Sequence, residues 1–557
     1  MMSLLINNMI RLYGASVSFY FDQAAKDPKK AQTNLLMRIV RDNTASAFGK
    51  AHGFSIIKTE AQYRKQIPIR DFEGYRPYIN HILSGKKRVL TVADPVRFNI
   101  TSGTINEPKY IPVTHQSQNQ ELNLIGQWYY RALRDHPGFL DHYRAAIVSP
   151  LNEGKTQTGI PFGNASGMMF DRIPHLIRRF YVLPVCVFQI RDYEDRYFLI
   201  ARCALGKKVS FLLTPNPSTF IRLADIMTKH AEEIIKAIHD GKAGRDLLDQ
   251  PEILQSLSHA LTPDPERARY LEEILRRTGA LRPRDVWPEL KLIACWLGGS
   301  VGIQAYKLSA FYGDLPIRDL GYMASEAHMT LPYQDNTASG ILAIQTNYYE
   351  FVPEEVHGTQ NPPVLSCYEI EEGKRYAVLL TTSSGLYRYD INDIVEVTGF
   401  YHRTPLLAFI RKGQDMTNVT GEKMHTNHIL AAMDEARRQF NLPLEQFRAA
   451  PDFENSRYCI YMELSANMPE KVLRDEVIPL IDQVLAKVNV EYAEKRKSKR
   501  LKLPYLAMMQ RGWSEAECRK FVQSGKRDVQ FKWRVLCAEA RAEDNAVIIK
   551  TIESEKD

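Results

Sequence analysis

A run of hydroxyls, one glycine and one lysine occupies residues 101–109 of the chain, where the sequence reads TSGTINEPK. It directly follows the strand-like stretch 95–100. Backbone N–H groups and hydroxyls in such a loop can surround phosphate oxygens, while Lys109 adds a positive charge. The run is not the GxxxxGK[ST] phosphate loop, because Lys109 comes six residues after Gly103 and is followed by neither Ser nor Thr. These residues alone leave two interpretations open, a phosphate cradle and a polar surface turn.

A second group of polar residues lies at 320–326, in the sequence LGYMASE. It follows the apolar stretch 316–320, so its side chains are expected at the carboxyl end of a strand, where α/β proteins bind ligands. Glu326 could hold Mg2+ against a phosphate, and Tyr322 could stack on a base. The alternative is a packed aromatic ring and a surface charge.

A third group lies at 385–395, in the sequence GLYRYDINDIV. Asp393 ends a polar turn that enters an apolar strand. One carboxylate can accept hydrogen bonds from both hydroxyls of a ribose, which would hold a nucleoside. As an alternative, Asp390 and Asp393 could cap the turn.

The elements that must position these groups alternate between helical and strand-like patterns, which predicts α/β architecture. The clearest predicted helix covers 218–240, with Ser218 as its cap and Gly241 as its stop. Strands are predicted at 145–148, 209–213, 290–294, 341–345, 376–381, 394–398 and 406–410.

A polar stretch at 411–416 predicts the boundary between two domains. We expect a large, multi-sheet N-terminal domain at 1–410 and a smaller, mobile α+β lobe at 411–557. Within the lobe, helices are predicted at 425–439 and 469–488 and a short strand at 458–462. Gly413 in the charged linker is a reasonable hinge.

Composition excludes several classes of protein. The net charge of +8 arises from 73 basic and 65 acidic residues among 557, which is too dilute to indicate nucleic-acid binding but suits small anionic substrates. The seven cysteines form no C-x-x-C pair, so neither a zinc site nor a disulfide framework is predicted, and a reducing cytoplasm is the expected compartment. No signal peptide or membrane span is predicted, and the oligomeric state stays open.

In order along the chain, these segments resemble the adenylate-forming superfamily. They are most similar to its Gretchen Hagen auxin-responsive branch, the acyl acid–amido synthetases. The similar segments are AFGKAHGF (47–54), IPI (67–69), TSGTINEPK (101–109), YMASE (322–326), YRYDIND (387–393), TGFYHRTP (398–405) and VQFK (529–532). The resemblance covers nearly the whole chain in collinear order.

The resemblance implies a role for each matching residue. Glu326 would meet Mg2+, Asp393 would bind the ribose, and Lys532 would stabilise charge during adenylation. Arg411 would lie beside the hinge. The remaining residues would surround ATP: Thr101, Ser102, Gly103, Thr104 and Lys109 at the phosphates, Gly298, Gly299 and Ser300 near the adenine or acyl adenylate, and Tyr322 and Ser325 in the nucleotide pocket.

The implied reaction is the ATP-dependent ligation of a small carboxylic acid to an amine, with an amino acid as the expected acceptor. The carboxylate would attack ATP to form an acyl adenylate and pyrophosphate. The amine would then expel AMP, after the lobe has rotated to remove Lys532. Two alternatives stay open, transfer of the acyl group to coenzyme A or a carrier-protein thiol, and a catalytically silent nucleotide- or acyl-binding protein.

The sequence departs from the family pattern at a few positions. Ile105 and Asn106 replace the usual Thr and Gly of the phosphate loop, which removes one hydroxyl from it. Asn392 replaces the glycine before Asp393, and asparagine tolerates a positive φ better than most residues. Trp533 follows Lys532 where proline-like neighbours are common.

Overall fold

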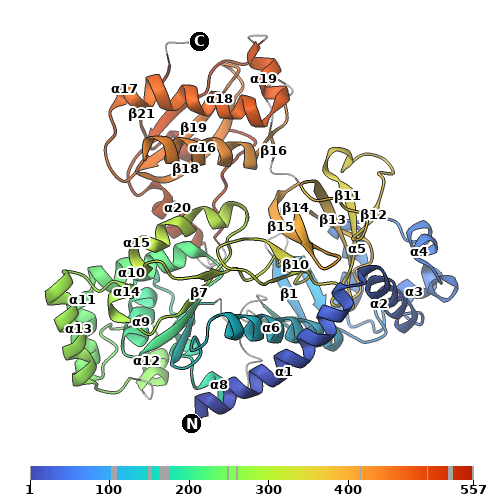
Figure 1. Cartoon of the computed structure of the whole chain (residues 1–557), viewed down its shortest axis with the longest axis horizontal. Helices are drawn as coiled ribbons and strands as arrows, with labels where there is room; N and C mark the ends of the chain where they lie inside the picture. Colours follow the sequence, from blue (N-terminus) through green and yellow to red (C-terminus); the bar gives the residue numbers. More distant parts are fainter. Residues whose placement is uncertain are drawn as a thin grey trace. The chain divides into compact units, whose positions relative to one another are not determined.

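The chain divides into two compact units, Met1–Phe409 (unit 1) and Ile410–Asp557 (unit 2). The structure is a computed structural model, shown in Figure 1. It describes residues 2–101, 109–148, 154–163, 175–247, 250–258, 261–413, 416–417, 419–420, 422–497, 500–524 and 531–554. Its mixture of helices and several sheets confirms the predicted α/β fold class.

The widest sheet of unit 1 has seven strands, and most of its neighbouring strands pair in antiparallel fashion. Its strand order is β12-β11-β13-β14-β15-β10-β9. Along β14 buried residues largely alternate with more exposed ones, as expected for a sheet with one face on the core. The strands are β9 (Thr330–Pro332), β10 (Gly340–Leu342), β11 (Tyr348–Pro353), β12 (Leu365–Ser366), β13 (Arg375–Thr381), β14 (Tyr389–Tyr401) and β15 (Thr404–Lys412).

A β-bulge interrupts the pairing of β13 with β14. Ala377 pairs with Ile394 and Leu379 pairs with Asp390, so residues 391–393 lie opposite a single residue of β13. Within the bulge Asn392 has a φ of 57°, a conformation that asparagine tolerates better than most residues. Bulges redirect side chains beside functional sites.

The described residues of unit 1 also form two smaller sheets. One is parallel, in the order β3-β6-β7-β8, and the other contains the hairpin β1–β2, in the order β2-β1-β5-β4. Parallel pairing needs helical crossovers, and Figure 1 shows α9 and α10 beside the parallel sheet. The strands are β1 (Arg97–Thr101), β2 (Lys109–Val113), β3 (Tyr143–Ala146), β4 (Gly154–Lys155), β5 (Pro161–Gly163), β6 (Val209–Leu213), β7 (Leu292–Ala294) and β8 (Ile317–Arg318).

Most helices of unit 1 begin at a capping side chain. Ser46, Thr59, Asp71, Thr114 and Asp192 each accept a hydrogen bond from a backbone N–H in the first turn that follows. The main helices are α1 (Met2–Ala25), α2 (Pro28–Asp42), α4 (Glu60–Gln66), α5 (Phe72–Leu83), α6 (His115–Asp135), α9 (Tyr193–Leu205), α10 (Pro217–Lys229), α11 (Ala231–Asp240), α12 (Pro251–Ser258), α13 (Pro265–Thr278) and α15 (Leu308–Tyr312).

The predicted helix at 218–240 is wrong in two respects. The segment forms two helices, α10 and α11, with a break at His230. The cap of α10 is Asn216, whose side chain accepts from the N–H of Ser218 at 3.0 Å. Gly241 ends α11 in the left-handed conformation, as predicted.

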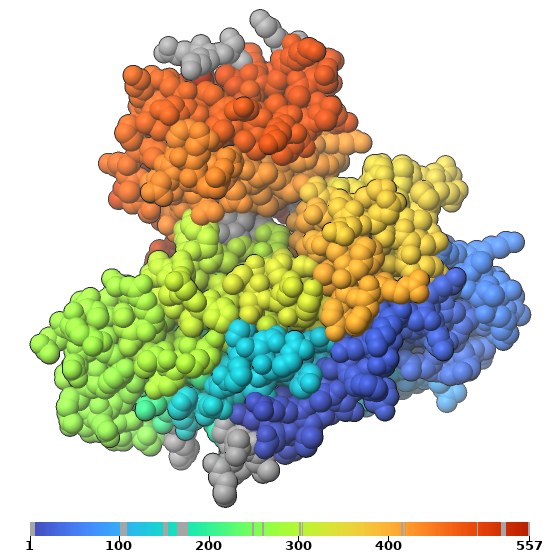
Figure 2. Space-filling view, in the orientation of Figure 1, coloured from blue at the N-terminus to red at the C-terminus, as the bar shows by residue number. Residues whose placement is uncertain are grey.

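Helices α1 and α6 lie side by side on the surface of unit 1, in dark blue and cyan in Figure 2. The core inside includes a stack of aromatic rings around Phe48, Tyr75 and Tyr387. Across the described part of the chain, no helix has both the length and the apolar run that crossing a bilayer requires.

Unit 2 contains a four-stranded sheet in the order β18-β19-β20-β21 and a two-stranded sheet, β16-β17, together with helices. Helices α16 and α18 pack against each other. The predicted strand at 458–462 and helix at 425–439 are confirmed, whereas 469–488 is interrupted by a π-helical turn at Leu473–Val477. The elements are β16 (Met416–Thr417), β17 (Met424–His425), α16 (Thr426–Phe440), β18 (Leu444–Asp452), β19 (Arg457–Leu464), α18 (Ile478–Val488), α19 (Val490–Lys497), β20 (Tyr505–Met509), α20 (Trp513–Gln523), α21 (Ala542–Asn545) and β21 (Ile548–Ile552).

Candidate active site

The two ends of the predicted phosphate loop are paired in the hairpin β1–β2. Thr101 is the last residue of β1 and pairs with Lys109, the first residue of β2. The ammonium of Lys109 lies 5.3 Å from the centre of the Phe72 ring, at the start of α5. The other predicted loop residues, Ser102, Gly103 and Thr104 with the departures Ile105 and Asn106, lie outside the described residues.

The structure brings together two predicted residues far apart in the sequence, Tyr322 and Asp393. The Tyr322 hydroxyl donates to Oδ2 of Asp393 at 2.7 Å. Burial and the neighbouring carboxylate raise the pKa of Tyr322 well above its ordinary value, so its hydroxyl stays protonated and remains a donor. The Tyr322 ring also stacks on Phe409, with 5.4 Å between ring centres. This bond orients the Asp393 carboxylate, a group with about four lone-pair sites for hydrogen bonds in all.

Glu326 and Ser325 are fixed by residues from other strands. The hydroxyl of Tyr389, the first residue of β14, donates to Oε1 of Glu326 at 3.0 Å. The backbone oxygen of Ser325 accepts from Nδ2 of Asn99 at 2.8 Å. Asn99 lies on β1, two residues before Thr101, so the YMASE segment is tied to the base of the predicted phosphate loop.

A buried carboxylate connects the glycine-rich turn after β7 to the YMASE segment. Asp319 accepts from the N–H of Leu297 through Oδ2 and from the N–H of Gly321 through Oδ1, both at 2.6 Å. Gly298 therefore follows an anchored residue, and Gly299 turns with a φ of 60°. Ser300 belongs to the 3₁₀ helix Gly299–Lys307, and its side chain lies outside the described part.

A side chain added at Gly298 would press against its surroundings. Its Cβ would lie 3.3 Å from the backbone oxygen of Phe409 and 3.3 Å from Cβ of Ala338. Glycine at this position thus keeps the turn close to Phe409, the residue on which Tyr322 stacks.

The two aspartates of β14, Asp390 and Asp393, have different hydrogen-bond partners. Asp390 caps the turn, because its Oδ1 accepts from the N–H of Asn392 at 2.7 Å, and it also contacts Nε2 of His357 at 2.8 Å. Asp393 contacts Tyr322 instead. The capping interpretation therefore holds for Asp390, whereas Asp393 contacts Tyr322, another residue of the predicted nucleotide site.

Arg411 and Lys532 belong to unit 2 and are described within it. The Arg411 guanidinium is buried, and its Nη1 donates to the backbone oxygens of Lys412 and Gly413 at 2.9 and 3.3 Å. Lys532 is exposed. Arg411 thus stabilises the backbone of the linker that contains the predicted hinge, Gly413.

Acidic side chains are too sparse for an all-protein metal cage in the described part of the chain, where no group of three or more His, Cys, Asp or Glu could hold an ion. Glu326 is half-buried and has Tyr389 as an orienting partner. One such carboxylate fits Mg2+, which is commonly bound by one or two carboxylates together with substrate phosphates.

Sequence reasoning missed the residues that hold the predicted ones in place, namely Asn99, Asp319 and Phe409. Asp319 did carry a signal, because it is an acid between the short strand β8 and Gly321. Asn99 is a polar residue between the apolar residues Phe98 and Ile100 of β1. Phe409 has no signal of its own, since one more apolar residue in β15 looks like core.

The Asp319 carboxyl should make the stability of unit 1 depend on pH. Burial raises its pKa to about 7, although its two backbone hydrogen bonds act in the opposite direction. The folded state therefore holds a proton that the unfolded chain, with a pKa near 3.9, releases. The contribution of Asp319 to the free energy of unfolding is largest below about pH 4. It is lost as the pH rises to about 7, and the free energy of unfolding falls by up to about 1.4 kcal/mol per pH unit in this range.

Asp319→Asn tests this prediction by denaturant unfolding between pH 4 and 9. An amide can accept only one of the two N–H groups, so the variant should be less stable by about 1–3 kcal/mol at pH 4. As the pH rises to about 7, the wild type loses about 4 kcal/mol of stability and the uncharged variant does not, so the difference should shrink, reverse in sign and then stay constant. A difference in stability that does not vary with pH would contradict the prediction.

Comparison with known proteins identifies the family that this chain matches. The GH3 family N-terminal domain matches residues 19–317, its central domain matches 340–412, and its C-terminal domain matches 427–541. The first of these domains alone spans more than half of the chain.

Named relatives match over most of their length. An indole-3-acetic acid-amido synthetase, GH3.15 of Arabidopsis thaliana, is 25% identical over 471 residues, 79% of this chain and 78% of the relative. A jasmonoyl–L-amino acid synthetase, GH3.5 of Oryza sativa subsp. japonica, is 24% identical over 550 residues, 92% and 93% of the two chains.

Solved structures show the same fold. The structure of a GH3.15 acyl acid amido synthetase superimposes with a TM-score of 0.83 at 20% identity and covers 98% of each chain. The resemblance predicted from the ordered motifs is therefore confirmed, and the chain belongs to the GH3 family.

Proposed function

We propose that this protein is an ATP-dependent, AMP-forming ligase that adenylates a small carboxylic acid and transfers the acyl group to an amino acid as an amide. The observation that carries the proposal is the meeting of Tyr322 with Asp393 beside the Glu326–Tyr389 pair. These residues come from the two motif segments that the sequence assigned to a nucleotide. The relatives named above are amido synthetases, which supports amide formation as the second step.

Each residue would act on one part of the substrate. Asp393, oriented by Tyr322, would accept from the ribose hydroxyls. Lys109 and the 101–104 segment would offset the phosphate charge, and Gly298 and Gly299 would let the nucleotide approach the backbone. Glu326 would hold Mg2+, which supplies charge neutralisation at the phosphates.

Lys532 and Arg411 would serve the reaction from unit 2. As the acid attacks the α-phosphorus, negative charge builds up between two anions, and a lysine ammonium stabilises that charge. Arg411 would brace the linker at 411–413. Unit 1 would then bind ATP and the acid, and unit 2 would carry the lysine.

A two-step assay tests the proposal. Pyrophosphate release is measured with ATP, Mg2+ and a panel of acids that includes indole-3-acetate and jasmonate, the acids in the names of the two relatives. The most active acid is then offered each amino acid, and also coenzyme A, with product identification by mass spectrometry. We expect acid-dependent pyrophosphate release and an acyl–amino acid product.

Other outcomes contradict the proposal in different ways. Thioester formation with coenzyme A and no amide would indicate an acyl-CoA ligase. Nucleotide binding without pyrophosphate release for any acid would indicate a silent binding protein, for which the departures Ile105 and Asn106 would be the first explanation.

A further inference from the structure

Lys532 lies on an extended segment that is bound along the edge of β18. The N–H of Ala449 donates to the oxygen of Val535 at 2.7 Å, and the N–H of Cys537 donates back to the oxygen of Ala449 at 2.9 Å. Along the segment Lys532 and Arg534 are exposed, whereas Trp533 and Val535 are buried. This alternation is that of a strand, in which successive side chains point to opposite faces.

Aromatic packing fixes the segment next to Lys532 on both sides. On one side, Trp533 is buried and its Nε1 donates to the backbone oxygen of Phe447 at 2.6 Å. On the other side, the Phe531 ring lies 5.4 Å from Phe521 of α20 and 6.2 Å from Trp533. The lysine is therefore placed between two anchored rings.

The buried guanidinium of Arg448 is the centre of this arrangement. Its Nε donates to the backbone oxygen of Arg534 at 3.0 Å. Its Nη1 donates to both carboxylate oxygens of Asp544 at 2.8 and 2.7 Å, and its Nη2 donates to both oxygens of Glu517 at 2.8 Å. All three nitrogens of a side chain that is 0% exposed are thus in use.

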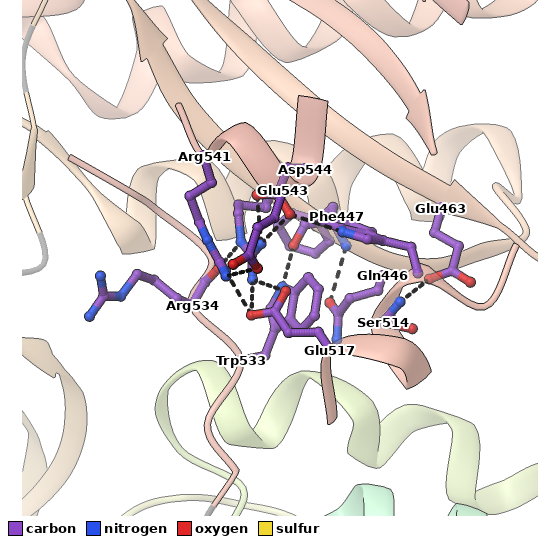
Figure 3. A network of polar contacts seen from close by, with 12 residues as sticks. Gln446, Phe447, Glu463, Ser514, Glu517, Trp533, Arg534, Arg541, Glu543 and Asp544 are labelled. Carbon is purple, nitrogen blue, oxygen red and sulfur yellow. Dashed lines mark hydrogen bonds and ion pairs between the residues drawn. The ribbon is translucent and has the colours of Figure 1, made fainter. Parts of the chain in front are cut away.

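Two tryptophans enclose the guanidinium. Its central carbon lies 4.2 Å from the centre of the Trp533 ring and 5.2 Å from that of Trp513. The two rings meet edge to face at 4.8 Å, and Nε1 of Trp513 donates to Oδ1 of Asp544 at 3.0 Å. Figure 3 shows Trp533, Glu517 and Asp544 converging within this network, while the labelled Arg534 side chain points away from it.

The network is balanced in charge and joined to the rest of unit 2. Arg541 donates to Oε1 of Glu517 at 2.7 Å, so two arginines face the carboxylates of Glu517 and Asp544. The N-terminus of α20 is held separately, because Glu463 accepts from the N–H groups of Gly512 and Ser514 at 2.6 and 3.0 Å. The Arg448 group therefore rests on a fixed helix and a fixed strand.

We propose that Arg448 is a positioning residue for Lys532, because it fixes the 531–537 segment through the Arg534 backbone oxygen and the Trp533 ring. The inference rests on the role proposed for Lys532 in adenylation. Removing the fork of Arg448 would leave the lysine present but misplaced, and a misplacement of about 1 Å can lower a rate by about 100-fold.

The Arg448→Lys variant tests this positioning role. The lysine keeps a positive charge between Asp544 and Glu517, so unit 2 should still fold, but it lacks the planar fork that reaches Arg534 and stacks on Trp533. The matched control is Arg457→Lys. Arg457 lies on β19, donates to Glu553 at 2.8 Å and lies 4.3 Å from the Tyr505 ring, and thus is also paired and stacked.

We expect Arg448→Lys to slow the adenylation half-reaction and to leave the aminolysis half-reaction unchanged. Arg448→Lys should lower the kcat of acid-dependent pyrophosphate release by about tenfold or more, with little change in the KM for ATP. Aminolysis of a chemically prepared acyl adenylate should stay near the wild-type rate, and Arg457→Lys should change neither step. Equal losses in both half-reactions, or an unchanged rate of pyrophosphate release, would overturn the inference.

Hydrogen–deuterium exchange on the full-length chain gives a readout that does not depend on activity. Amides in 531–537 should exchange faster in Arg448→Lys than in the wild type, while those of β19 and β20 stay protected. Unchanged exchange in the segment would overturn the anchoring role. If the wild type released no pyrophosphate with any acid, the proposed function would fail, and the exchange experiment would still decide whether Arg448 anchors the segment.

Discussion

Replacing Lys532 by alanine should lower the rate of acid-dependent pyrophosphate release by about 100-fold or more. Attack of a carboxylate on ATP brings two anions together, and a positioned charge of this kind is worth about 10²–10³ in kcat. The same variant should bind ATP normally, because the proposed ATP contacts are on unit 1. Radiolabelled ATP–pyrophosphate exchange measures the first effect, and equilibrium binding of ATP measures the second.

The prediction is specific to one half of the reaction. Aminolysis of prepared acyl adenylate should proceed near the wild-type rate in Lys532→Ala, because that step takes place at the acyl carbon after the lobe has rotated to remove Lys532. Lys502→Ala, which removes another exposed lysine of unit 2, is the control and should leave both steps unchanged. Wild-type pyrophosphate exchange in Lys532→Ala would show that the adenylation lysine is another residue.

Glu326→Gln should have the second largest effect, through Mg2+. The amide keeps an oxygen that can accept from the Tyr389 hydroxyl, now 3.0 Å from Glu326, so the geometry should survive while the negative charge is lost. Divalent magnesium prefers charged oxygen ligands. We expect the Mg2+ concentration that gives half-maximal pyrophosphate release to rise by about tenfold, and the maximal rate to fall by about 10- to 100-fold.

A titration of Mg2+ at saturating ATP measures both quantities. Glu372→Gln, an exposed glutamate of the same unit, is the control. Tyr389→Phe should shift the Mg2+ requirement in the same direction but less, because the carboxylate keeps its charge and loses only its orienting bond. An unchanged Mg2+ requirement in Glu326→Gln would remove this residue from the metal site.

The sequence predicts the strands of this protein better than its helix ends. Apolar runs such as Val209–Leu213 and 376–381 become β6 and most of β13, because a buried strand needs apolar side chains whatever its neighbours are. Periodicity does not reveal the break at His230, because the buried residues of α10 and α11 keep a helical spacing on both sides of it. The acidic first turn of α11 at Glu232 and Glu233 is the signal that marks it.

For the candidate site, the sequence predicts which chemical groups take part but not the residues that support them. Tyr322, Glu326 and Asp393 are recognisable from their motifs. The contacts that orient them join residues far apart in the sequence, such as Asn99 with Ser325, and no local pattern encodes such a pairing. The Arg448 network escapes sequence reasoning for the same reason, because its members come from β18, α20, α21 and the 531–537 segment.

The Arg448 network also bears on the conformational entropy of the reaction. Ordering a flexible backbone segment costs about 1–2 kcal/mol per residue. With Trp533 buried and the 535–537 backbone bonded to β18, that loss is incurred once, when unit 2 folds, and not in each catalytic cycle. The temperature dependence of adenylation should therefore lack the large unfavourable activation entropy of a segment that orders during turnover.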